Sequence, residues 1–273
     1  MVSGSDRAGK PGHRYRARGL PGALAIALAT WCLGPLYAAE CPKPRELTLP
    51  ALQQPEDNID KVKDRLKAYQ ASNYEKDIAA AIEGATKQIG DRVAENRALP
   101  VDQMKRLAIV LDIDETSLSN WKNIEANNFG FIPGGTCPLT ARTACGFIAW
   151  IDMATAPAIE PTLQLFNFAK SRDVAVFFIS GRRKSQREAT ILNLDRAKFE
   201  GWRALTLRDD NDHADSIVPF KSGQRAELEK PENFKNGEKP FTIIANIGDQ
   251  QSDLAGGFAE CGIKLPNPFY FIK

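Results

Sequence analysis

The sequence predicts an α/β fold: a parallel sheet flanked by helices, with a small cap inserted after the first strand and a helical extension before it. Two observations carry this prediction. From Leu107 onward, short runs rich in Val, Ile, Leu and Phe alternate with longer segments whose apolar residues recur at helical spacing. The short runs are apolar on both faces, which is typical of parallel strands covered by helices on each side.

The composition fits a protein with a substantial core and argues against a nucleic-acid-binding protein. The chain has 273 residues, of which 43% are apolar, so it can bury one large core or two small ones. Its formal net charge is +2, but five basic residues and one acidic residue lie in residues 1–38. The remainder therefore carries a net charge of −2, which is not the profile of a partner for a nucleic acid polymer.

Residues 1–38 have the three parts of a secretory signal peptide. A basic stretch ends at Arg18, an apolar core LPGALAIALATWCLG follows, and small residues suited to cleavage come near Ala38 or Ala39. The alternative is a membrane anchor, but the apolar run is too short and too interrupted to span a bilayer comfortably. We therefore expect a periplasmic or secreted protein without a stable membrane anchor.

The cysteines agree with export into an oxidising compartment. Once Cys32 is removed with the signal peptide, four cysteines remain, and an even number in an exported protein suggests two disulfides. Four cysteines allow three pairings. We favour Cys137–Cys145 with Cys41–Cys261, and free buried thiols are the alternative.

Residues 39–106 are predicted to form an extended segment followed by two helices. The first part is rich in Pro, and the pattern from Asn58 to Asn96 is helical with a break around residues 71–73. Apolar residues recur at helical spacing on both sides of this break: Ile59, Val62, Leu66 and Tyr69, then Ile78, Ile82 and Ile89. We expect the two helices to brace the main domain, and they are also a candidate surface for a homodimer.

The main domain, residues 107–273, is predicted to alternate strands and helices. The predicted strands are residues 107–114, 174–180, 204–208 and 242–248. The predicted helices are residues 160–172, 182–197, 221–230 and 252–260. Residues 117–160, approximately, form an insertion that we expect to cover the carboxyl ends of the strands as a cap.

Charged and polar residues follow the predicted strands at the points where the strands end. These residues are Asp112, Asp114, Ser180, Gly181, Lys221, Asp249 and Asp253. Each alone has an ordinary structural explanation, such as a helix N-cap, a charge at a helix start or a surface lysine. Because ligands of parallel sheets bind beyond the carboxyl ends of the strands, their shared placement favours a single site.

The residue types at these strand ends indicate metal-assisted phosphoryl chemistry. Four carboxylates require a cation, and oxygen ligands favour Mg²⁺ over softer metals. Lys221 and the helix start after Ser180 can bind an anion, most simply a phosphate. An aspartate beside a phosphoryl group can act as a nucleophile and form an aspartyl-phosphate, while a second carboxylate two residues later can transfer protons.

The scarcity of histidine disfavours other phosphatase chemistries. After removal of the signal peptide only His213 remains, which excludes enzymes that combine a phosphohistidine with a second catalytic histidine. His213 lies in the polar loop DDNDHAD without a nucleophile elbow nearby, so we do not expect a Ser-His-Asp hydrolase.

Four segments resemble the motifs of the haloacid dehalogenase (HAD) superfamily of phosphohydrolases: DIDET at 112–116, ISGR at 179–182, Lys221 and GDQQSD at 248–253. Longer stretches, LDIDETSLSNW, FKSGQR, GDQQSDL and KLPNPFYFI, resemble the acid phosphatases of subfamily IIIB. That subfamily groups plant vegetative-storage-type proteins with bacterial class C-like secreted enzymes. The resemblance covers roughly Ala108 to Lys273 and implies an HAD-like Rossmannoid core.

The resemblance implies catalytic and metal-binding roles for the carboxylates. Asp112 is similar to the nucleophile, and Asp114 is similar to the general acid/base, whose backbone carbonyl also binds Mg²⁺. Asp249 is similar to a further metal ligand. Asp253 is similar to a residue that acts through a metal-bound water or by orienting Lys221.

The resemblance also implies roles for residues around the carboxylates. Ser180 and Lys221 are similar to the phosphate binders, with the backbone amide of Gly181 helping, and Thr116 is similar to the residue that fixes the nucleophile's turn. Glu115 is interpreted as a structural residue. Arg225 is interpreted as a buried partner of an acid.

The activity implied is that of a secreted, Mg²⁺-dependent acid phosphatase that hydrolyses phosphate monoesters through an aspartyl-phosphate. A phosphotransferase of the same fold and a non-catalytic periplasmic binding protein are the alternatives. Four aromatic residues in or near the cap either stack the base of a nucleoside monophosphate or, as we slightly favour, fill the cap's own core: Trp121, Phe129, Phe131 and Trp150. Asn120 and Asp152 are candidates for the entrance to the site.

Overall fold

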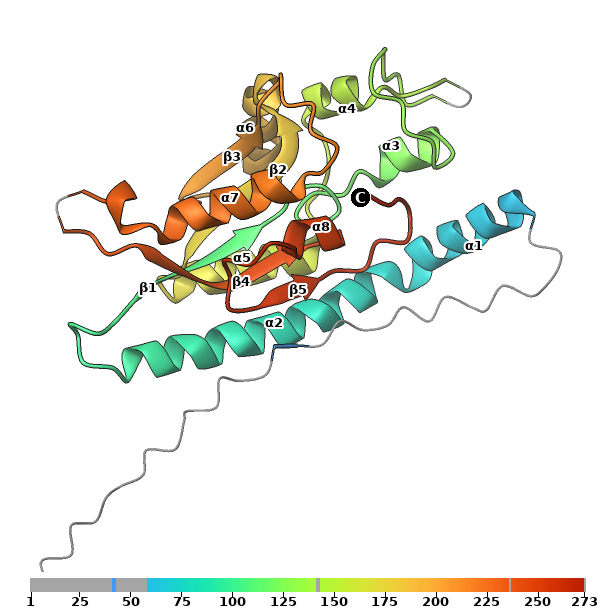
Figure 1. Cartoon of the computed structure of the whole chain (residues 1–273). Coiled ribbons are helices and arrows are strands. Elements are labelled where there is room, and N and C mark those ends of the chain that lie inside the picture. The colour runs from blue at the N-terminus through green and yellow to red at the C-terminus, as the bar shows by residue number, and fades with distance from the viewer. Residues whose placement is uncertain (1–40, 43–57, 141–142, 236, 273) are drawn as a thin grey trace, which may run out of the picture. The chain divides into compact units, whose positions relative to one another are not determined.

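A parallel sheet in the order β3-β2-β1-β4-β5 forms the centre of the protein (Figure 1). The computed structural model describes residues 41–42, 58–140, 143–235 and 237–272, which belong to one compact unit, Ala39–Lys273. The strands are β1 (Arg106–Leu111), β2 (Ala175–Arg183), β3 (Ala204–Arg208), β4 (Phe241–Gly248) and β5 (Gly262–Lys264). The predicted α/β class is confirmed. The predicted signal peptide lies outside the described residues.

Strand β1 occupies the middle of the sheet, and its side chains alternate between two cores. Ile109 and Leu111 belong to the larger core, together with residues of α2 (Tyr74–Arg97), α5 (Glu160–Ser171) and α6 (Arg187–Arg196). Ala108 and Val110 belong to the smaller core, which α7 (Val218–Glu229) covers. Because β1 pairs in parallel with β2 and with β4, the residues that follow it lie beside the carboxyl ends of both strands.

Helix α2 runs along one side of the sheet, and the helix before it extends past the end of the sheet (Figure 1). Helix α1 (Ile59–Ser72) begins after Asn58, whose side chain accepts a hydrogen bond from the amide of Asp60 at 2.8 Å. Helix α2 packs against α5, β4 and β5. An ion pair between Arg92 and Glu260 (2.7 Å) connects α2 to the main domain. The disulfide Cys41–Cys261 connects the segment before the helices to the main domain.

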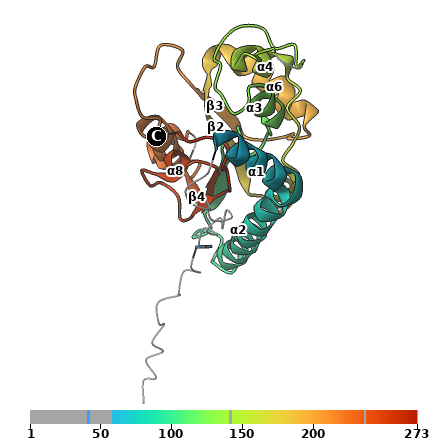
Figure 2. The same ribbon diagram turned by 90° about the vertical axis from the view of Figure 1, so that its right-hand side faces the viewer.

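The insertion after β1 contains two short helices, α3 (Trp121–Ala126) and α4 (Phe147–Met153), which lie beyond the sheet (Figure 2). The two sides of its base are joined by backbone hydrogen bonds. The amide of Ile159 donates to the carbonyl of Ser117, and the amide of Ser119 donates to that of Pro157, both at 2.9 Å. The second predicted disulfide, Cys137–Cys145, is present in this cap.

Several predicted boundaries move, and each has a local reason. Strand β2 continues through Arg183 and is followed by the 3-10 helix η1 (Lys184–Gln186), so Ser180 lies within a strand and not directly at a helix start. Helix α7 begins at Val218, which places Lys221 in its first turn. Helix α8 (Gln251–Leu254) is shorter than predicted, because two glycines with positive φ, 86° and 77°, follow it.

Two remaining elements complete the fold. Strand β5 was not predicted, since its three residues are too few for a periodic pattern. A second 3-10 helix, η2 (Pro231–Asn233), follows α7. Within the described part of the chain, no helix combines the length and the apolar character needed to span a bilayer.

Candidate active site

The loop after β1 directs Asp112 into a pocket at the carboxyl edge of the sheet. The amide of Asp112 still donates to the carbonyl of Ile247 on β4, at 3.0 Å. The chain then turns sharply, with Glu115 at a φ of 50° and the hydroxyl of Ser117 donating to the carbonyl of Asp112 at 2.7 Å. These bonds fix the backbone of Asp112, so its side-chain direction is set by the sheet and the turn.

Lys221 lies between two carboxylates. Its Nζ is 2.6 Å from Oδ1 of Asp112 and 2.6 Å from Oδ1 of Asp253, and all three side chains are buried. Burial alone would lower the pKa of Lys221, but the two carboxylates raise it above its usual value. Lys221 therefore remains a cation at the floor of the pocket.

Asp249 and Asp253 come from the loop after β4. The carboxylate of Asp249 accepts hydrogen bonds from Thr116 (3.2 Å), Gln250 (2.6 Å) and Asn267 (2.7 Å). Oδ2 of Asp253 accepts from the amide of Gln250 at 2.8 Å. A Cβ atom at position 248 would lie 2.4 Å from Cβ of Asp253, so a glycine is required before Asp249.

The carboxylates of Asp112, Asp249 and Asp253 form a buried cluster in which one oxygen from each lies within 4.8 Å of the others. Burial raises the pKa of Asp112 well above its usual value, Lys221 opposes that shift, and the charges of Asp253 and Asp249 add to it. Burial and the charge of Asp253 raise the pKa of Asp249 to about 7. Three buried oxygen donors that repel one another fit a divalent cation such as Mg²⁺.

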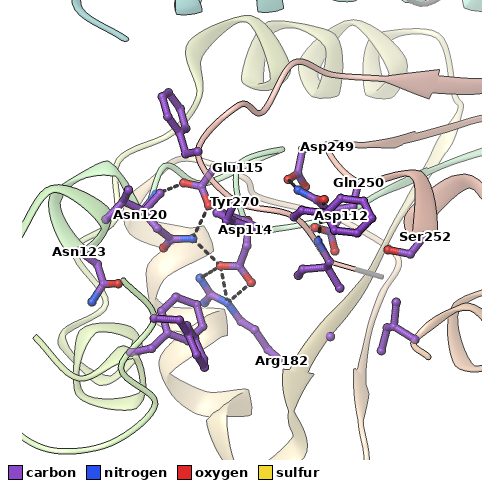
Figure 3. A pocket seen from close by; sticks show the side chains of 18 of the residues that line it. Asp112, Asp114, Glu115, Asn120, Asn123, Arg182, Asp249, Gln250, Ser252 and Tyr270 are labelled. Carbon is purple, nitrogen blue, oxygen red and sulfur yellow. Dashed lines mark hydrogen bonds and ion pairs between the residues drawn. The ribbon is translucent and has the colours of Figure 1, made fainter. Parts of the chain in front are cut away.

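The side chain of Asp114 points away from this cluster, as Figure 3 shows. Its Oδ1 accepts hydrogen bonds from Nη2 of Arg182 and Nδ2 of Asn120, each at 2.8 Å. Asn120 in turn accepts a hydrogen bond at 2.8 Å from the indole of Trp150 on α4. Burial alone would raise the pKa of Asp114, but the charge and hydrogen bonds of Arg182 and the hydrogen bond of Asn120 hold it below its usual value.

Glu115 is a buried carboxylate that ties the loop to the cap base and to the end of the chain. It accepts hydrogen bonds from the amide of Asn120 (2.5 Å) and from the hydroxyl of Tyr270 (2.9 Å). Burial, with a contribution from the charge of Asp114, raises the pKa of Glu115 to about 7. These contacts agree with the structural interpretation of this residue.

The structure shows the contacts of three further residues that the sequence singled out. Ser117, not Thr116, bonds the turn at Asp112, while Thr116 donates to Asp249. Arg225 donates to the backbone carbonyls of residues 253, 255 and 257, and it is close enough to the buried acid Asp253 to interact with its charge, although its hydrogen bonds go to the backbone. Ser180 is fully buried, and its hydroxyl accepts a hydrogen bond from the amide of residue 182 at 3.2 Å.

Sequence reasoning missed Arg182, Asn267 and Tyr270 as neighbours of the site. Arg182 stands in the ISGR segment at the end of a strand, and that placement was the signal available for it. Asn267 and Tyr270 stand in KLPNPFYFI, a segment that carries no strand-end signal. One further buried hydroxyl lines the pocket, that of Ser252, and it has no hydrogen-bond partner among the described residues.

The pocket has a volume of about 670 Å³ and differs in chemistry from floor to mouth. Asp112, Lys221 and the other charged groups line its floor.

The cap aromatics are divided between core and pocket. Trp150 is buried, and Trp121 packs against Phe269 with ring centroids 5.1 Å apart. Phe131 is 73% exposed at the mouth, and Asp152 does not line the pocket.

Comparison with known proteins gives consistent matches. A family model described as HAD superfamily, subfamily IIIB (Acid phosphatase) matches residues 49–273. Acid phosphatase 1 of Solanum lycopersicum is 33% identical over 164 residues, which cover 60% of this chain and 58% of that protein. The stem 28 kDa glycoprotein of Glycine max is 30% identical over 167 residues, covering 60% and 59%. The chain thus matches less than two thirds of the length of these curated relatives.

The fold is also similar to that of a solved structure. The crystal structure of a class C acid phosphatase from Bacillus anthracis with tungstate bound superimposes with a TM-score of 0.55. The sequences are 22% identical, and the match covers 77% of this chain and 86% of that one. This similarity supports the arrangement of strands and helices described above.

Proposed function

Because the chain belongs to the acid phosphatase family of HAD subfamily IIIB, we propose that it is an active phosphoric monoester hydrolase that uses Mg²⁺. The observation that carries the proposal is the buried cluster of Asp112, Asp249 and Asp253, two of which, Asp112 and Asp253, contact the ammonium group of Lys221. A pure binding protein does not need a second aspartate, Asp114, held separately at the same pocket.

The metal-binding role is proposed for the three clustered carboxylates together with the backbone carbonyl of Asp114. Their oxygen donors suit Mg²⁺, and their mutual repulsion in a buried position is relieved by a divalent charge. When bound, Mg²⁺ neutralises the negative charge on a transferring phosphoryl group.

The proposed reaction begins with attack by the carboxylate of Asp112 on the phosphorus atom of a phosphate monoester. A bond forms between the carboxylate oxygen and phosphorus, and the bond between phosphorus and the ester oxygen breaks. The departing alcohol takes a proton from Asp114. Asp114, now ionised, accepts a proton from the water that attacks the aspartyl-phosphate, which releases inorganic phosphate and restores Asp112.

Other residues position the groups that react. Lys221, the hydroxyl of Ser180 and the backbone amide of Gly181 are proposed to hold the oxygens of the phosphoryl group. Arg182 and Asn120 hold the carboxylate of Asp114 through the hydrogen bonds described above. Arg182 and Asn120 hold the pKa of Asp114 below its usual value, so the proton that the departing alcohol requires is supplied only when the medium is acidic.

Nucleoside monophosphates are candidate substrates. The pocket volume lies within the range of about 300–1,000 Å³ typical of small-molecule sites, and Phe131 leaves an aromatic face exposed at the mouth. We also propose that the protein is exported to the periplasm or secreted, with residues 1–38 as its signal peptide. The two disulfides support export, since such bonds persist in oxidising compartments.

The test is hydrolysis of p-nitrophenyl phosphate at pH of about 5 to 6 by protein purified with both disulfides formed. Activity should be lost after EDTA, return with Mg²⁺, and fall by about four orders of magnitude or more in Asp112→Asn. Asp152→Asn is the matched control, because Asp152 is exposed and does not line the pocket. Transfer of phosphate to an added alcohol would identify a phosphotransferase, and folded protein without any activity would contradict the proposal.

A further inference from the structure

Trp150 of α4 is buried and does not line the pocket, so its ring cannot stack on a ligand there. Its indole nitrogen is nevertheless bonded to the site, because it donates to Oδ1 of Asn120 at 2.8 Å. An indole N–H can only donate and a carboxamide oxygen can only accept, so this bond fixes which end of the Asn120 amide faces the cap. The cap therefore contacts the site through a single polar side chain as well as through its apolar residues.

The other end of the Asn120 amide lies between two carboxylates (Figure 3). Its Nδ2 donates to Oδ1 of Asp114 at 2.8 Å and to Oε2 of Glu115 at 3.1 Å. All the polar atoms of this amide are thus engaged, so its position and its orientation are both set. We call residues 267–272 the C-terminal segment, and its Tyr270 donates a hydrogen bond to Glu115 at 2.9 Å. Asn120 and its partners therefore join the cap, the loop after β1 and the C-terminal segment.

The two oxygens of Asp114 are held unequally. Oδ1 accepts from Nδ2 of Asn120 and Nη2 of Arg182, each at 2.8 Å. Among the described residues, Oδ2 accepts only from Nε of Arg182, at 3.2 Å, and that donor is shared with Oδ1 at the same distance. Oδ2 is therefore the less firmly bonded oxygen and the one available to exchange a proton with a ligand in the pocket.

The helix that carries Trp150 is itself fastened to the main domain. The side chain of Asn193 on α6 donates to the carbonyl of Ala156 at 2.7 Å and accepts from its amide at 3.2 Å. Nη1 of Arg196 on α6 donates to the carbonyl of Met153, the last residue of α4, at 3.2 Å. Trp150 also packs in the larger core. The position of its indole N–H is therefore determined by the folded domain and not by the cap alone.

We propose that Trp150 is a positioning residue for proton transfer: through Asn120 it holds Oδ1 of Asp114 and thereby keeps Oδ2 toward the leaving group. The inference rests on the proposed function, in which the proton of Asp114 passes to the ester oxygen as its bond to phosphorus breaks. A misplaced proton donor slows this step most when the leaving oxygen is strongly basic, because such an oxygen cannot depart without a proton.

The test compares two phosphate esters of similar shape in the wild-type protein and in Trp150→Phe. 4-Nitrobenzyl phosphate releases a strongly basic alkoxide, whereas p-nitrophenyl phosphate releases a weakly basic phenolate. For the benzyl ester kcat/KM should fall by about tenfold to a hundredfold, and for the phenyl ester it should stay within about threefold. Equal losses for the two esters, as expected if Trp150 only supports the fold, would overturn the inference, and so would no loss for either.

A second variant changes the indole with less disturbance to packing. Replacing Trp150 with 3-benzothienylalanine puts sulfur in place of the N–H and nearly keeps the shape of the ring, so it tests the hydrogen bond even if Trp150→Phe does not fold. It should show the same selective loss on the benzyl ester. Trp202→Phe is the matched control, since Trp202 packs against Phe178 with ring centroids 6.3 Å apart and does not line the pocket.

A spectroscopic measurement separates failure of this inference from failure of the proposed function. Residues 39–273 contain three tryptophans, Trp121, Trp150 and Trp202, so their indole N–H signals can be assigned in NMR spectra. Asp114→Asn should move the signal of Trp150 through Asn120 and leave that of Trp202 in place. This result needs no turnover, so it decides whether Trp150 is coupled to Asp114 even if the wild type hydrolyses neither ester. An unmoved Trp150 signal would overturn the inference.

Discussion

The floor and the mouth of the pocket differ in charge and in exposure to solvent. At the floor, Asp112, Lys221 and Asp253 are charged, at most 6% exposed and held by short hydrogen bonds. At the mouth, Phe131 and Phe271 are apolar and about three quarters exposed. The comparison shows that the charged groups proposed to react are placed by the sheet, whereas the apolar surface around them comes from an insertion and a loop that follows β5.

This difference has a physical reason. Buried charges are tolerated only when partners surround them, so a change at the floor leaves another charge unpaired. Exposed apolar side chains at the mouth make few stabilising contacts, so replacing them should lower the free energy of unfolding less. The floor should therefore respond to substitution through stability and turnover, and the mouth through substrate selection.

The largest expected effect is on stability and comes from Lys221→Met. Removing the ammonium group leaves Asp112 and Asp253 buried without a cation, which should cost about 3–5 kcal/mol of unfolding free energy in the absence of metal. Lys87→Met is the matched control, because its ion pair with Asp91 is exposed and should contribute about 0.5 kcal/mol or less. Urea unfolding in EDTA measures both variants, and equal losses would contradict the distinction between buried and exposed charges.

The next effect is on turnover and comes from Arg182→Lys. The change keeps a positive charge but removes the planar group that contacts Asp114 through two nitrogens, so kcat should fall by about tenfold to a hundredfold with KM nearly unchanged. Arg208→Lys is the control, since Arg208 forms a similar pair with Asp212 away from the reacting groups. A comparable loss of kcat in the control would show that any arginine pair at the pocket matters equally.

A smaller effect should follow from opening the cap disulfide with Cys137→Ser and Cys145→Ser together. The cap wall then loses a constraint, so KM for 1-naphthyl phosphate should rise several-fold while kcat for glycerol 2-phosphate stays within about twofold. The comparison variant replaces Cys41 and Cys261, which join residues 220 positions apart. It should lose about 2–5 kcal/mol of unfolding free energy with KM unchanged. A higher KM in this variant and an unchanged KM in the cap variant would contradict the prediction.

The smallest effect is expected from Tyr270→Phe. It removes one hydrogen bond to Glu115 and should cost about 1 kcal/mol of unfolding free energy, with a loss of about twofold in kcat/KM for aromatic esters because the C-terminal segment is less firmly held. Tyr69→Phe removes a similar bond, to Asp77 at 2.8 Å, outside the pocket. Thermal unfolding should show similar losses for both, and kinetics should show a change only for Tyr270→Phe.

The parts of the fold that could be predicted are those with a strong local pattern. Strand β3 begins and ends at the predicted residues, and the end of α5 differs from the prediction by one residue. These elements could be predicted because apolar runs and helical periodicity are local properties of the sequence. Strand β5 could not be predicted, since it exists through its pairing with β4 and not through its own sequence. The extent of β2 beyond Ser180 likewise depends on irregular pairing with β3.

The site likewise has features that the sequence predicts and features that it does not. The rule that polar residues gather at the carboxyl ends of parallel strands was enough to anticipate that Asp112, Lys221 and Asp253 lie together. The same rule says nothing about which partner a side chain takes. The pairing of Arg182 with Asp114 and the arrival of Tyr270 at Glu115 depend on where distant segments pass, which a single sequence does not encode in a readable pattern.

The order of the strands has a consequence for the newly made chain. A chain growing from its N-terminus contains Asp112 and the cap well before it contains β4, which must lie beside β1. Asp249 and Asp253 follow β4 in the sequence, so they emerge from the ribosome after it. Until then the carboxylate cluster is incomplete and the sheet has no partner on one side of β1. The groups proposed to carry out the reaction therefore come together only after β4 has joined the sheet.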